Sequence, residues 1–279
     1  MDSSKGPSMK YTLGSLLPAL CIAIFAAGCA ATPQRIASAD SYAGSATGFL
    51  DKSVLVDDKV ARYALYVPEN YTPDKPWPLI VFLHGSGERG DDNLLQTEVG
   101  IGSAIRRNRD WFPALVLMPQ CPEDRFWDAA VPAIEAALVQ TRATYHVDDR
   151  AITLTGLSLG GYGTWIWGGL NVDTFAALMP VCGGGDPADL GKRLLKSSKG
   201  RLGTMDERVQ NLAKVPIWAF HGAEDDVVAP ERSRAMVERV QAAGGKVRYT
   251  EFPKTGHNSW DAAYGQREHI QWLLKQRRP

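Results

Sequence analysis

The chain has 279 residues, of which 44% are hydrophobic and 22% are charged, and its 31 basic residues balance its 31 acidic residues. This length and composition are typical of a soluble globular protein with a large buried core, in one large domain or two small ones. The balanced charge gives no sign of a polyanionic partner, so we expect no binding to nucleic acid.

The N-terminus has the features of a secretory signal. Lys5 and Lys10 precede an apolar run over residues 13–27, which ends in small residues before Cys29. A basic start, an apolar core of this length and a small-residue cleavage site are typical of signal peptides, and the run is too short for a comfortable membrane span. We therefore expect a signal peptide over 1–28, a flexible tether of small and polar residues over 29–50, and one folded domain over 51–279.

The residues around Cys29 resemble the lipobox of bacterial lipoproteins, because small residues stand directly before the cysteine. The resemblance implies cleavage before Cys29 and acylation of its thiol and amine, which would anchor an exported protein to a membrane. Ala30 after the cysteine favours the outer membrane by the same resemblance. Ordinary signal cleavage, with Cys29 incidental, is the alternative.

The folded part of the chain alternates between strand-like and helix-like segments. Short β-rich runs at 54–56 and 62–67, separated by Asp57 and Asp58, predict a hairpin, and the four prolines of 68–78 predict a loop. Apolar runs without alternation predict strands that are buried on both faces, at 79–83, 114–118, 151–155, 176–179 and 217–220. Residues 247–252 are also strand-like, and helical periodicity occurs at 129–143, 160–170, 230–243 and 261–275. This alternation predicts an α/β fold with a mostly parallel, doubly wound sheet.

The pentapeptide Gly156–Gly160 has the pattern Gly-x-Ser-x-Gly and lies between a predicted strand and a predicted helix. This pattern is typical of a strained turn that exposes a serine hydroxyl, here that of Ser158, as a nucleophile. Taken alone, it is equally compatible with an ordinary glycine-rich turn. A nucleophilic serine also needs a base, an acid that orients the base, and donors for an oxyanion.

The partners of Ser158 are sought among five histidines. His257 lies on a loop after residues 247–252 and is the expected base. Asp225, on the loop after the strand at 217–220, is the expected orienting acid, with Asp226 as the alternative. The chain order serine, acid, histidine is that of hydrolases with this serine turn.

A further loop, which starts at His84 directly after a predicted strand, is glycine-rich. Such a loop donates a backbone N–H to the oxyanion, so we expect the donors to be the N–H groups of Ser86 and Leu159. His84 itself is expected to stabilise the loop, and neither His146 nor His269 is expected to take part in catalysis.

Together these motifs resemble those of α/β-hydrolases, and among them of lidless esterases related to feruloyl and acetyl-xylan esterases, polyhydroxybutyrate-depolymerase-like proteins and the catalytic domains of prolyl oligopeptidases. The segments that carry the resemblance are 84–91, 119–122, 156–163, 221–225 and 256–258, and it extends from about Val54 to the C-terminus. It implies an α/β-hydrolase fold with helices on both faces of the sheet. It also implies a serine carboxylesterase that hydrolyses short-chain or carbohydrate-linked acyl esters without metal or cofactor, so the expected partner is a small-molecule or oligosaccharide ester. A prolyl-oligopeptidase-like peptidase and a non-catalytic binding lipoprotein are the alternatives, and no oligomeric state is predicted.

Other residues near the predicted strand ends are each open to two interpretations. Trp127 and Trp260 either form an aromatic wall for a substrate ring or simply pack under loops. The charged run from Glu88 to Asp92 either binds a polar substrate or holds the oxyanion loop through ion pairs. The segment Lys192–Arg201, with five basic residues in ten, is either a solvated insertion or a basic lip that attracts an anionic substrate or a lipid headgroup.

Two cysteines, Cys121 and Cys182, fall in the body of the expected domain. Each follows a predicted strand, and the two strands are expected to lie three apart in the sheet, which is roughly 14 Å at the usual spacing. A disulfide needs Cα atoms within about 7 Å. We therefore expect two free, partly buried thiols, although an exported protein could pair them if the two loops converged.

Overall fold

The computed structural model describes residues 46–123, 125–190 and 202–279, which all belong to one compact unit spanning Ala37–Pro279. The expected signal peptide, Cys29 and most of the expected tether lie outside the described residues, as does the basic segment Lys192–Arg201. Within the described ranges, we find no helix with both the length and the apolar character needed to cross a membrane.

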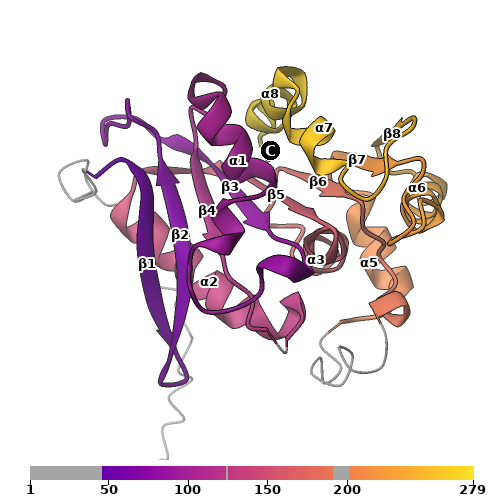
Figure 1. Cartoon of the computed structure of the whole chain (residues 1–279), viewed down its shortest axis with the longest axis horizontal. Coiled ribbons are helices and arrows are strands. Elements are labelled where there is room, and N and C mark those ends of the chain that lie inside the picture. The colour runs from indigo at the N-terminus through magenta and orange to yellow at the C-terminus, as the bar shows by residue number, and fades with distance from the viewer. Residues whose placement is uncertain (1–45, 124, 191–201) are drawn as a thin grey trace, which may run out of the picture. The chain divides into compact units, whose positions relative to one another are not determined.

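The described residues form one eight-stranded sheet in the order β1-β2-β4-β3-β5-β6-β7-β8 (Figure 1). The strands are β1 (Gly48–Val56), β2 (Lys59–Val67), β3 (Trp77–Leu83), β4 (Leu115–Pro119), β5 (Val147–Leu157), β6 (Ala177–Val181), β7 (Ile217–Gly222) and β8 (Val247–Phe252). The hairpin β1–β2 is antiparallel and joins β4 antiparallel, whereas β3 to β8 pair with one another in parallel. The carboxyl ends of six strands therefore meet at one edge, where open α/β sheets place their binding sites.

Helices cover both faces of this sheet (Figure 1). Their bounds are α1 (Gly100–Arg107), α2 (Trp127–Thr144), α3 (Leu159–Leu170), α5 (Met205–Leu212), α6 (Glu231–Ala242), α7 (Trp260–Tyr264) and α8 (Arg267–Lys275). Apolar residues of α2, α3, α5 and α6 belong to one buried cluster, and those of α1, α7 and α8 belong to a second. The doubly wound α/β fold predicted from the sequence is confirmed.

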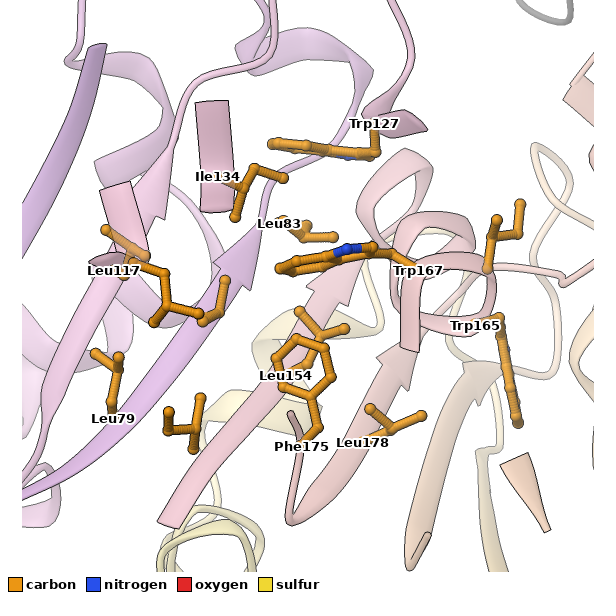
Figure 2. Close-up of a cluster of buried hydrophobic side chains, with 14 of the residues drawn as sticks. Leu79, Leu83, Leu117, Trp127, Ile134, Leu154, Trp165, Trp167, Phe175 and Leu178 are labelled. Atoms are coloured by element: carbon orange, nitrogen blue, oxygen red, sulfur yellow. The ribbon is translucent and has the colours of Figure 1, made fainter. Parts of the chain in front are cut away.

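The strands alternate their side chains between these two clusters, although their sequences show no polar alternation. In β3, Leu79, Val81 and Leu83 enter the first cluster, while Ile80 and Phe82 enter the second. Figure 2 shows part of the first cluster, in which leucines of the central strands pack with tryptophans of α2 and α3. A strand buried on both faces needs apolar residues at every position, which is why an unbroken apolar run was the correct signal.

The hairpin turn is formed by Asp57 and Asp58, which have φ values of 48° and 60°. Two successive residues with positive φ are characteristic of the tight turns that match the twist of a hairpin, and aspartate tolerates this conformation better than most residues. The hairpin is confirmed at the predicted place. Its first strand, however, begins at Gly48, inside the range expected to be tether.

Some element boundaries differ from the expectation. The loop rich in proline ends before Pro78, because β3 begins at Trp77, whose N–H bonds to His146 O. The single helix expected over 261–275 is two helices, α7 and α8, separated at Gly265 and Gln266. Helices α1 and α5 were not predicted. A signal for α5 was present in the sequence, because Thr204 and Glu207 form a capping box at its start.

Neither of the two cysteines of the domain forms a disulfide, as expected, and both are fully rather than partly buried. Cys121 follows β4 and Cys182 follows β6, and these two strands are separated by β3 and β5. The sheet order therefore keeps the thiols apart, and the prediction of free thiols is confirmed.

Candidate active site

Ser158 lies on a strained turn between β5 and α3, with φ of 52° and ψ of −114°. The flanking glycines permit the turn: a Cβ on Gly160 would lie 1.9 Å from Leu83 O, and one on Gly156 would lie 2.4 Å from Gly160 O. No side chain fits at such distances from backbone atoms. The Ser158 N–H bonds to Val181 O at 3.0 Å, which ties the strained residue to β6. Strain of this kind persists only where the surroundings enforce it, and it is often found at functional sites.

The structure brings His257 and Asp225 to Ser158 from two other loops. His257 Nε2 lies 2.9 Å from Ser158 Oγ, and its Nδ1 lies 2.8 Å from Asp225 Oδ2. The His257 ring can therefore donate its Nδ1–H to the carboxylate and keep Nε2 as an acceptor for the serine hydroxyl. The three residues form a continuous hydrogen-bonded chain, although they lie far apart in the sequence.

Asp225 is held in place by its own loop. Its Oδ1 accepts N–H groups from Val227 at 3.0 Å and Val228 at 2.9 Å, and its side chain is fully buried. Burial opposes ionisation of this carboxyl, but hydrogen bonds from His257 and the two backbone groups outweigh it, so the pKa of Asp225 is lowered. The neighbouring Asp226, the alternative acid, is exposed.

The two residues predicted to supply the oxyanion donors line the same cleft as Ser158. Leu159 is the first residue of α3, so its N–H has no acceptor within the helix. Ser86 begins a short turn after β3 and lines the same cleft as Ser158 and Leu159. The preceding Gly85 lets this loop approach closely, because a Cβ there would lie 3.6 Å from Ser158 Cβ and 2.9 Å from a Leu157 methyl group.

The charged residues of this loop stabilise it from within. Glu88 Oε2 accepts the Gly85 N–H at 2.9 Å, and Arg89 Nε donates to Ser86 O at 3.1 Å. His84 is fully buried and accepts the Cys121 N–H on Nε2 at 2.9 Å. Its Nδ1 lies 2.6 Å from Gly85 O, so that nitrogen carries the hydrogen. These contacts agree with the interpretation that both His84 and the charged run hold the oxyanion loop, but Glu88 and Arg89 do so through hydrogen bonds to backbone groups rather than through the expected ion pairs.

A cleft of about 670 Å³ opens beside Ser158. One of its walls is polar and combines Tyr162 with the ion pair Asp189–Arg232. Tyr162 lies within the serine motif over residues 156–163. Asp189 and Arg232 could not be predicted as part of the site, because they belong to no motif and meet only through the packing of α6 against the loop after β6.

The two tryptophans proposed as an aromatic wall have different environments. The Trp260 ring is half-buried and stands edge-to-face with the His257 ring, with centroids 5.4 Å apart. Trp127 is only 1% exposed, and its indole N–H donates to His84 O at 3.2 Å. Because Trp127 starts α2 and packs in the first buried cluster (Figure 2), its environment favours the alternative interpretation, in which it packs under a loop.

Two of the remaining histidines bond to backbone carbonyls away from the cleft. His146 Nδ1 lies 2.7 Å from Pro73 O, and His269 Nδ1 lies 2.8 Å from Ala263 O. In the ranges that the structure describes, no cluster of three or more histidine, cysteine or acidic side chains has a geometry that could hold a metal ion.

A serine on a strained strand-to-helix turn, at the carboxyl edge of a mostly parallel sheet and followed in the chain by an acid and then a histidine, is the α/β-hydrolase arrangement. This chain has the α/β-hydrolase fold, and the composition of its site resembles that of serine hydrolases with this fold.

Comparison with known proteins agrees with this class. A thermostable esterase of known structure is 35% identical, with a TM-score of 0.67 over 82% of this chain and 63% of that one. Two further solved structures are each 15% identical to this chain. One is an S-formylglutathione hydrolase from Staphylococcus aureus, with a TM-score of 0.64 over 83% of this chain and 98% of that one. The other is a ferulic acid esterase, with a TM-score of 0.63 over 81% of this chain and 98% of that one, and at this identity both show a likeness of fold alone.

Among curated proteins, an uncharacterized secreted protein of Arthroderma benhamiae is 28% identical over 202 residues, which cover 66% of this chain and 21% of that protein. This chain thus spans about a fifth of that relative and less than two thirds of the thermostable esterase. No protein-family model matches the sequence.

Proposed function

We propose that this protein is a serine carboxylesterase in which Ser158 is the nucleophile, His257 the general base and acid, and Asp225 the residue that orients the base. The observation that carries the proposal is the unbroken chain from Ser158 Oγ to His257 Nε2 at 2.9 Å and from His257 Nδ1 to Asp225 Oδ2 at 2.8 Å. This chain opens into a cleft that two backbone donors also line.

The reaction uses groups that are already in position. His257 Nε2 takes the hydroxyl proton as Ser158 Oγ attacks the ester carbonyl, and Asp225 stabilises the imidazolium that forms. The Ser86 and Leu159 N–H groups bind the negative charge of the tetrahedral intermediate, which is worth about 10²–10³ in rate for a single donor. His257 then returns the proton to the leaving alcohol, and a water that His257 activates hydrolyses the acyl-enzyme.

The proposed substrates are short-chain or carbohydrate-linked acyl esters. Esterases are among the structural relatives, one of them a ferulic acid esterase. The Trp260 ring beside His257 and the polar cleft wall of Tyr162, Asp189 and Arg232 support this proposal, because together they suit a substrate with both an apolar and a hydroxyl-bearing part.

The decisive test is Ser158→Ala, measured with p-nitrophenyl acetate. We expect kcat to fall by about 10⁵–10⁶-fold, because the nucleophile of a triad accounts for most of its rate. A panel of acetyl, feruloyl and peptide substrates on the same sample then defines the leaving group. Undiminished turnover by the alanine variant would exclude the proposed nucleophile, and a preference for the peptide would favour the peptidase instead.

We also propose that the protein is exported and lipid-anchored through Cys29 after cleavage of residues 1–28, in the outer membrane. The secreted relative supports export, and the lipobox-like residues before Cys29 support the anchor. Cys29→Ser should shift the protein from the membrane fraction to the soluble fraction. A serine variant that stays membrane-bound contradicts the anchor.

A further inference from the structure

A second histidine lies against the carboxylate of Asp225. His221 is the last but one residue of β7 and is fully buried. Its Nε2 lies 3.1 Å from Asp225 Oδ2, the same oxygen that accepts from His257, and 2.8 Å from Val228 O. The mechanism above leaves this residue without a role.

The hydrogen bonds around the His221 ring fix the position of its hydrogen. Both groups that face Nε2, the Asp225 carboxylate and the Val228 carbonyl, are acceptors only. On the other side, Nδ1 lies 2.7 Å from the Ser233 hydroxyl, which also lies 2.8 Å from Gly183 O. If the hydroxyl donates to Nδ1, the neutral ring must carry its hydrogen on Nε2. If the hydroxyl donates to Gly183 O instead, Nδ1 carries a hydrogen. A neutral ring would then leave a bare Nε2 against two acceptors, and a doubly protonated ring is opposed by burial, which lowers the pKa of His221. The first arrangement, with the hydrogen on Nε2, is therefore favoured.

Asp225 therefore has two donor groups near each of its carboxylate oxygens. Val227 and Val228 supply two backbone N–H groups to Oδ1, and His257 donates its ring N–H to Oδ2. The His221 Nε2–H, which bonds to Val228 O, is shared with Oδ2 at an N···O distance of 3.1 Å. A carboxylate surrounded by these four donors cannot rotate without breaking hydrogen bonds, and the negative charge on Oδ2 interacts with two imidazole rings.

We propose that His221 is a positioning residue for catalysis: its Nε2–H fixes Asp225 Oδ2 and limits how strongly that oxygen holds the His257 imidazolium. The inference rests on the proposed hydrolase activity. Without the His221 donor, Asp225 would hold the charged form of His257 more tightly, and the base would become available only at higher pH.

The charged and titratable groups around His221 are few. Asp225 and His257 lie on loops at the same sheet edge, and Glu251 pairs with His221 in the register of β7 and β8. Arg234 binds Glu251 through two nitrogens at 2.6 and 2.9 Å, so that carboxylate is already neutralised. Burial raises the pKa of the Cys182 thiol on the neighbouring loop to about 12, so it stays uncharged.

Two amide variants separate positioning from packing. His221→Gln can place an N–H donor near the position of Nε2, whereas the shorter amide of His221→Asn reaches only the Ser233 side. Both replace the buried ring by a smaller polar group. We therefore expect similar losses of stability, which thermal unfolding measures, but different effects on catalysis.

The readout is the pH dependence of kcat/KM for p-nitrophenyl acetate between about pH 5 and pH 9. We expect the acid limb of the Asn variant to move upward by about one pH unit, so that its kcat/KM at pH values below the limb falls about tenfold, with the Gln variant close to the wild type. Equal profiles for the two variants, or a downward shift in the Asn variant, overturn the proposal.

A second measurement does not depend on activity. In ¹⁵N-histidine spectra of the wild type, with the His221 signal identified by its loss in the Gln variant, we expect a hydrogen on Nε2, and a bare Nε2 overturns the proposal. A wild type without Ser158-dependent hydrolysis would instead refute the proposed function, and the spectrum would still decide which groups His221 contacts as a donor.

Discussion

The oxyanion loop contains a buried histidine whose protonation should destabilise the folded protein. Burial lowers the pKa of His84 from its ordinary value of 6.5 to about 4. In the folded state its Nε2 accepts the Cys121 N–H and its Nδ1 bonds to Gly85 O, so no lone pair remains for a further proton. In the unfolded chain His84 binds a proton freely below pH 6.5.

The sign and size of the effect follow from linkage. Above pH 6.5 both states hold His84 neutral, and the stabilisation is complete. As the pH falls from 6.5 towards 4 only the unfolded state gains a proton, so the free energy of unfolding decreases by about 1.4 kcal/mol per pH unit. Over the two and a half pH units between the two pKa values of His84, the loss amounts to about 3 kcal/mol. For a domain of this size that corresponds to a decrease of about 6–12 °C in Tm.

The assay is urea unfolding of the wild type and of His84→Gln at pH 7 and pH 4. The His84→Gln variant is less stable than the wild type at pH 7 because it loses the buried ring, but it lacks the titrating group. The difference in unfolding free energy between the two proteins should therefore shrink by about 3 kcal/mol at pH 4. If the His84 difference is the same at both pH values, protonation of the buried ring is not what opposes folding in acid.

Two further predictions concern the serine and acid loops. Asp225→Asn should lower kcat by about 10⁴-fold, because an amide cannot accept from every donor around it and the tautomer of the base is lost. Asp226→Asn, its exposed neighbour, should stay close to the wild type, and a larger loss in Asp226→Asn would reassign the acid. Gly160→Ala should destabilise by about 3 kcal/mol or more, because its Cβ would lie 1.9 Å from a backbone oxygen. In Gly87→Ala the Cβ meets nothing within 4 Å, so its unfolding midpoint in urea should match the wild type, and equal midpoints for both alanine variants would refute the steric argument.

Much of the fold could be predicted because its signals are local. The strands β3 to β7 each contain a short apolar run, because the part of a strand that is buried on both faces needs apolar side chains at successive positions. Helix α1 was missed because three small or flexible residues, Gly100, Gly102 and Ser103, dilute its apolar periodicity. The break between α7 and α8 was missed because helical periodicity runs through Gly265, where only the packing of the two helices shows the interruption.

The sequence by itself determined the serine turn and the identity of the three residues expected to form the catalytic chain. Gly156–Gly160 requires its glycines because the backbone conformation of the serine turn depends on a few adjacent residues. The order of Ser158, Asp225 and His257 could likewise be read along the chain, since each follows a recognisable strand.

Only the tertiary structure decided how these residues and their neighbours are used. In the folded protein Trp127 is buried under the oxyanion loop, Asp189 pairs with Arg232 in the cleft wall, and His221 lies against the carboxylate of Asp225. The reason is physical: burial and hydrogen bonding depend on distances of a few ångströms between side chains from different strand ends. Those distances are set by the sheet order and by side-chain packing, which no local pattern of residues records.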